Sequence, residues 1–155
     1  DALLTMDIND QTTAQFQLET VINEYENTAS ASLAEYYLGK MSYVNNDIFN
    51  AEKYLRSYLN NNPKGFLAPS AAIILADILV SNKDFEKGFV LLDKCIKNSK
   101  SSKDVRQLKI RKAEYLVRNG QNSEAKLIIE KLLLEEDLTL WNKQIGQEIM
   151  GKILS

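Results

Sequence analysis

Small and apolar residues recur along this chain with a step of 37 residues. One series of small residues is followed four positions later by branched aliphatic residues; its members are Ala14, Ala51, Gly88 and Ala125, followed by Leu18, Leu55, Leu92 and Ile129. A second series with the same step precedes three of these sites by 12 residues and consists of Gly39, Ala76 and Ala113. The pattern therefore predicts two helices in each unit. A fixed period of about 20 to 50 residues is typical of a solenoid, whose units bury their apolar faces against their neighbours.

The periodicity predicts an all-α fold, a right-handed α-α superhelix of helix-turn-helix units with a capping helix at the C-terminal end. Helices are expected at about 12–25, 28–44, 48–60, 69–81, 85–98, 103–119, 122–135 and 138–154. As a single domain, the chain divides into a partial first repeat (1–27), three repeats (28–64, 65–101 and 102–137) and the capping helix (138–155). In the capping helix, apolar residues at every fourth position are expected to pack: Trp141, Ile145, Ile149 and Ile153.

The N-terminal edge of the array is predicted to be incomplete. Residues 12–25 correspond to the second helix of a unit, and its first helix would begin before Asp1. Residues 1–9 are therefore expected to form a remnant helix. Thr28 or Ser30 is expected to cap the following helix. Cys95 occupies a repeat position that is apolar elsewhere, so we expect it to be buried rather than reactive.

Several residues of the repeat resemble the tetratricopeptide repeat. These are Leu38-Gly39 in a first helix, Ala51 followed by Leu55 in a second helix, and Pro63 at the exit. The resemblance covers nearly the whole chain and implies a solenoid that binds proteins or peptides. It is weakest in 105–135, where Lys109 and Lys112 occupy positions that are apolar in the pattern, which leaves the helix register of the third repeat open.

Two stretches resemble tetratricopeptide proteins of the bacterial cell envelope: residues 21–28 (VINEYENT) and 33–39 (LAEYYLG). Those proteins include a family that is anchored by one N-terminal membrane helix beside the protein-export translocon, and lipoproteins of outer-membrane assembly. The resemblance implies a periplasmic scaffold, with any membrane contact made by a segment N-terminal to this chain. A cytoplasmic location stays open.

The composition argues against an enzyme. The chain has no histidine, which removes the commonest general base and His-bearing zinc sites. Its six glycines form neither a phosphate loop nor a dinucleotide fingerprint. The acids at 135–137 are expected to lie in a solvated turn. We therefore predict no catalytic residues, no cofactor and no metal site.

The predicted binding surface is the groove lined by the first helices of successive units. Mapping that face onto the sequence selects Leu33, Tyr36, Lys40, Tyr43, Ser70, Ile73, Asp77, Val80, Gln107, Ile110, Glu114 and Val117. Lys40, Asp77 and Glu114 alternate in sign, unlike the basic and asparagine pairs that grip a terminal carboxylate in chaperone-binding members of the family. The groove is therefore expected to prefer apolar side chains. Tyr36 and Tyr43 are either its anchors or part of the core between helices.

Charge is distributed unevenly along the chain. Residues 1–39 hold seven acids and no Lys or Arg, whereas residues 94–112 hold one acid and a basic patch of Lys94, Lys97, Lys100, Lys103, Arg106, Lys109, Arg111 and Lys112. Such blocks are either solvated helix faces or surfaces that steer a partner. The function predicted from the sequence is a non-enzymatic scaffold that binds a protein or peptide in a bacterial envelope complex. The alternatives are homo-oligomeric self-association and, with less support, binding of RNA or anionic lipid by the basic patch.

Overall fold

The computed structural model describes residues 8–155 and contains, within that range, eight α-helices and no strand. The helices are α1 (Ile8–Glu24), α2 (Ala29–Val44), α3 (Ile48–Asn61), α4 (Ala68–Ser81), α5 (Phe85–Asn98), α6 (Ser102–Arg118), α7 (Asn122–Leu133) and α8 (Leu140–Leu154). Each corresponds to a helix predicted from the sequence, so the all-α fold class is confirmed. The remnant helix predicted over residues 1–9 lies largely outside the described residues, and α1 begins at Ile8.

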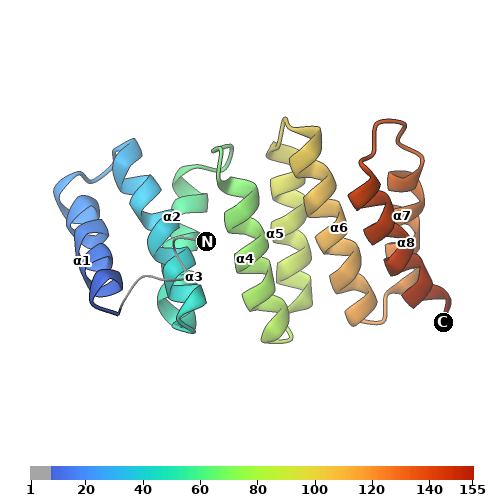
Figure 1. The fold of residues 1–155 in the computed structure, drawn as a ribbon, viewed down its shortest axis with the longest axis horizontal. Helices are drawn as coiled ribbons and strands as arrows, with labels where there is room; N and C mark the ends of the chain where they lie inside the picture. The colour runs from blue at the N-terminus through green and yellow to red at the C-terminus, as the bar shows by residue number, and fades with distance from the viewer. Residues whose placement is uncertain (1–7) are drawn as a thin grey trace. The chain divides into compact units, whose positions relative to one another are not determined.

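The chain forms two compact units, residues 1–75 and residues 76–155, with the boundary inside α4. In the first unit α2 packs against both α1 and α3 (Figure 1). In the second unit α6 contacts α5, α7 and α8, and α7 also contacts α8. Three-residue turns join α2 to α3, α4 to α5 and α6 to α7, as expected for antiparallel helix pairs.

Most of the residues that repeat every 37 positions lie in the cores of these units, whereas Ala14 and Leu18 on α1 are half-buried. Leu55, Leu92 and Ile129 are fully buried, and so are the small residues that precede them by four positions. Gly39 explains why a small residue is needed, since a Cβ atom there would lie 2.7 Å from Leu55 Cγ. Cys95 is buried, as predicted. The fixed spacing therefore results from close packing between helices.

The turn within each helix pair also repeats every 37 residues. Asn46, Lys83 and Gly120 all have left-handed backbone, with φ of 61°, 66° and 76°. The next residue donates its backbone N–H to a carbonyl five positions earlier at 2.8 Å in each turn: Asp47 to Ser42, Asp84 to Leu79 and Gln121 to Leu116. This is the hydrogen-bond pattern that closes a helix at a left-handed residue. At the start of α2, the Thr28 side chain accepts from the Ala31 N–H, as the capping prediction requires.

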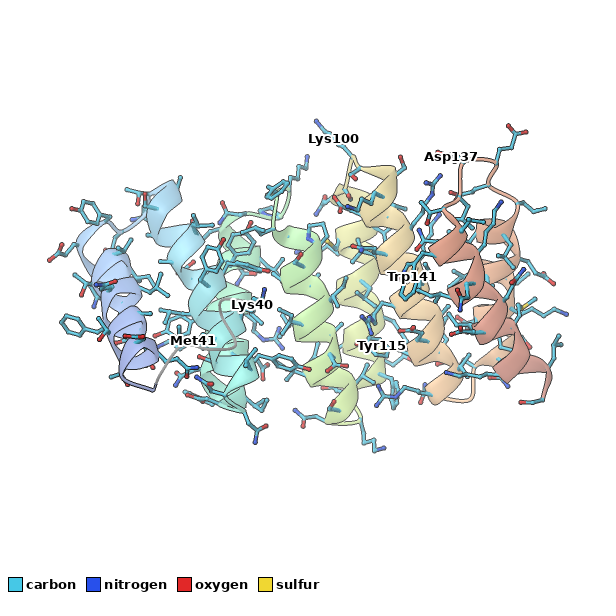
Figure 2. All side chains as sticks on the ribbon, viewed as in Figure 1. Lys40, Met41, Lys100, Tyr115, Asp137 and Trp141 are labelled. Carbon is cyan, nitrogen blue, oxygen red and sulfur yellow. The ribbon has the colours of Figure 1, made fainter. Side chains whose placement is uncertain are left out.

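The capping helix packs through a narrower face than the sequence predicted. In α8 the buried residues are Gly146 and Ile149, whereas Trp141 is 69% exposed. The expectation that Trp141 packs was wrong for a geometric reason. Each four-residue step rotates a side chain by about 40° around a helix of about 3.6 residues per turn, so two steps carry position 141 about 80° away from Ile149. Trp141 is labelled in Figure 2.

Candidate partner-binding site

A pocket of about 220 Å³ lies in the second unit where α4, α6 and α8 come together. It is lined by charged groups around a tyrosine and two aliphatic residues: Asp77, Arg111, Glu114, Tyr115, Val117, Arg118, Ile149 and Lys152. Asp77 and Glu114 are 37 residues apart and occupy equivalent places in successive first helices. The repeat therefore brings residues from three helices to one concave site.

Tyr115 connects two walls of the pocket and is labelled in Figure 2. Its side chain is buried, and its hydroxyl donates a hydrogen bond of 2.9 Å to Asp77 Oδ1. Burial, and then the hydrogen bond to Asp77, raises the pKa of the Tyr115 hydroxyl above its usual range. The hydroxyl therefore stays protonated at neutral pH and holds the Asp77 carboxylate in place.

The charged groups of the pocket are unevenly paired. Arg111 lies 3.3 Å from the Glu114 carboxylate, and the Arg118 guanidinium lies 5.6 Å from the centre of the Tyr115 ring. Within residues 8–155, neither Arg118 nor Lys152 forms an ion pair. Since both acids of the pocket already have partners, these two cations are the groups available to an anionic ligand.

Comparison with known families agrees with the repeat pattern and the paired helices. A model of the tetratricopeptide repeat-like domain matches residues 1–132. The chain belongs to this family. No significant match was found among curated proteins or among solved structures. Tetratricopeptide repeat-like domains in general serve as protein-interaction scaffolds and are typically not enzymes.

Only part of the groove predicted for this tetratricopeptide repeat-like protein lies at the pocket. Asp77, Glu114 and Val117 line it. Three other predicted residues are buried in the cores: Tyr36, Val80 and Ile110. The rest are exposed or half-buried on their own helices, namely Leu33, Lys40, Tyr43, Ser70, Ile73 and Gln107.

The sequence left open whether Tyr36 anchors a partner in the groove or packs in the core. The structure shows that it packs in the core. Its side chain is 5% exposed, and its ring lies 5.4 Å from that of Tyr37 and 5.7 Å from that of Tyr58, between centroids. Tyr36 therefore belongs to the contact between α2 and α3. Tyr43 is half-buried near the end of α2.

The sequence did not single out the two cations of the pocket. Arg118 directly follows the predicted groove residue Val117, so it lies about 100° further around α6 than the mapped face. Lys152 belongs to α8, which was assigned a capping role alone. The 37-residue step indicates the region of Lys152, because the position 37 residues after Glu114 is Gly151, which directly precedes Lys152.

The basic patch is divided by ion pairs in the second unit. Arg106, whose side chain is 12% exposed, binds Glu135 at 2.5 Å and also Asp137 in the turn after α7. Lys112 on α6 binds Asp93 on α5 at 2.8 Å, which explains how a lysine is accommodated at a position that the repeat pattern makes apolar. The acids at 135–137 therefore do more than face solvent. The exposed members of the patch are Lys94, Lys97, Lys100 and Lys103, while Lys109 is half-buried.

The described residues contain neither a cluster of metal-binding side chains nor a helix that could span a membrane. No group of three or more His, Cys, Asp and Glu side chains in that part of the chain could hold a metal ion. None of its helices is long and apolar enough to cross a membrane.

Proposed function

We propose that this chain is a scaffold that binds an acidic segment of a protein partner at the pocket between α4, α6 and α8. The observation that carries the proposal is that Arg118 and Lys152 form no ion pair with any described residue and lie beside a tyrosine that fixes the pocket wall. A carboxylate of the partner would accept charge-assisted hydrogen bonds from these groups. Val117, which is half-buried, supplies apolar contact area beside them.

The resemblance of residues 21–28 and 33–39 to envelope proteins supports a place for the scaffold in a bacterial envelope complex. Crosslinking in cells, followed by fractionation, tests this placement. Recovery of the crosslinked complex with envelope proteins is expected. Recovery with cytoplasmic partners alone would contradict it.

Binding at the pocket is tested with two fluorescein-labelled decapeptides that differ only in having Glu or Gln at two central positions. The acidic peptide should bind the full chain, and Arg118→Gln or Lys152→Gln should each weaken its binding by about tenfold, the loss of one hydrogen bond to a charged group. Lys131→Gln is the matched control, because Lys131 is exposed in the same unit and forms no ion pair among the described residues. Equal affinity of the acidic peptide for wild type and both pocket variants would refute the assignment.

Self-association is a second candidate function, and exposed apolar side chains around the start of α8 favour it. Leu134, Leu140 and Trp141 are all largely exposed within eight consecutive residues. Large exposed apolar patches often mark contact surfaces. Light scattering over a range of concentrations should show a dimer that Leu140→Ser disrupts. A monomer at every concentration would eliminate this candidate.

A further inference from the structure

A second and larger cavity, of about 500 Å³, lies in the first unit. It is formed where the turn between α1 and α2 meets the C-terminal end of α3. The turn is held in shape by Asn27, which has left-handed backbone, and by Thr28, whose hydroxyl donates to the Tyr25 carbonyl at 2.6 Å. The cavity wall is therefore built by local hydrogen bonds that need no ligand.

One wall of this cavity carries a carboxylate that is only half satisfied. Glu35 on α2 accepts a hydrogen bond of 2.6 Å at Oε1 from the hydroxyl of Ser57 on α3. Its other oxygen, Oε2, is removed from solvent contact and has no hydrogen-bond partner within residues 8–155. Among the described residues, no other buried side-chain nitrogen or oxygen is left in this state. Burial of a charged oxygen without a partner is costly in free energy. A hydrogen-bond donor next to Glu35 would therefore be stabilising.

The remaining lining determines which donor fits. Glu26 adds a second carboxylate, and Asn27, Asn61 and Asn62 add side-chain amides, while no described Lys or Arg lines the cavity. Asn61 and Asn62 lie at the C-terminal end of α3, where the helix dipole favours positive charge. A water molecule occupies about 30 Å³ of liquid, so the volume accommodates a group much larger than one water.

We propose that this cavity binds the guanidinium or ammonium group of an arginine or lysine side chain from a protein partner, with the Glu35 carboxylate as its principal acceptor. The proposal does not rest on the pocket at Arg118 and Lys152, because that pocket belongs to the other unit and prefers the opposite charge. A partner that uses both sites would present acidic and basic side chains.

The probe is the capped tripeptide acetyl-Gly-Arg-Gly-amide, compared with its citrulline counterpart, which keeps the shape and loses the charge. Titration of the full chain, followed by amide NMR, should show saturable shifts at 26–35, 57 and 61–62 with the arginine peptide alone. Glu35→Gln should weaken this binding at least tenfold. Glu86→Gln, which removes an exposed carboxylate from α5, should leave it unchanged.

Thermal melts separate binding from a purely structural role of Glu35. If the Glu35 carboxylate is fully satisfied only when a cationic ligand binds, Glu35→Gln should melt at the same or a higher temperature than wild type. The variant should also lose the rise in melting temperature that the arginine peptide causes in wild type. The proposal is overturned if wild type shows no such rise, if the citrulline peptide binds equally well, or if putrescine, a free diamine, binds more tightly than the peptide.

Discussion

On α8, truncation of the smaller residue Ile149 should lower the free energy of unfolding more than truncation of the larger residue Trp141. Ile149 is 3% exposed, whereas Trp141, the larger residue, is 69% exposed. Ile149→Ala removes three buried carbon atoms at roughly 0.8 kcal/mol each, and the resulting cavity adds to the cost, so the free energy of unfolding should fall by about 3 kcal/mol. Trp141→Ala should cost less than about 1 kcal/mol, as surface substitutions do.

Urea unfolding followed by far-ultraviolet circular dichroism measures both costs, since this signal does not depend on the indole. Parts of repeat proteins can unfold separately, so hydrogen exchange of the α8 amides should be measured alongside. Faster exchange confined to α8 in Ile149→Ala would show that the lost contacts dock this helix. The packing described for α8 is refuted if Trp141→Ala costs as much as Ile149→Ala.

Three further predictions follow from the cores and the turns. Gly39→Ala should destabilise by about 1 to 3 kcal/mol through the clash with Leu55, whereas Gly151→Ala, which has open space around it, should stabilise by roughly 0.5 to 1 kcal/mol; chemical denaturation distinguishes the two. Burial, with a smaller contribution from Asp104, raises the pKa of Cys95 to about 11, so its alkylation at pH 8 should be at least about 100-fold slower in the folded than in the unfolded chain, and equal rates would contradict its burial. The same shift means that the stability contributed by the neutral thiol is full below about pH 8.5 and is lost as the pH rises through about 11. Lys83→Gly should raise the unfolding free energy by about 1 kcal/mol, because glycine adopts the left-handed backbone at this turn without strain, and a lower melting temperature would exclude that explanation.

The 37-residue step allowed the helices and core positions to be predicted, because the same contact between helices recurs and demands a small residue followed by a large one. The functional surfaces were harder to predict, because they depend on which side chains remain unpaired after folding. Arg118 and Arg106 are both arginines of α6, yet Arg118 lies at a pocket and has no ion pair in the part of the chain that the structure describes, whereas Arg106 is held by Glu135. Sequence spacing alone could not distinguish them.

Glu35 shows a signal that was present in the sequence but was not used. It is one of the seven acids of residues 1–39, and it lies four residues after Ala31 and four before Gly39, both of which are buried. A carboxylate between two core positions of one helix face is unusual, because charged groups are seldom buried without a partner. That spacing indicates a specific role for Glu35 even before its surroundings are known.

The left-handed turns have a consequence for protein engineering. Asn, Lys and Gly occupy the same backbone position in three successive helix pairs, with the same closing hydrogen bond. The turn between paired helices is therefore specified by its backbone geometry and tolerates different side chains. Longer arrays built from this chain can carry glycine at this position of every turn, as at Gly120. Each replacement of Asn or Lys by glycine there is expected to raise the free energy of unfolding. The residues on the helix faces then remain free to be chosen for recognition.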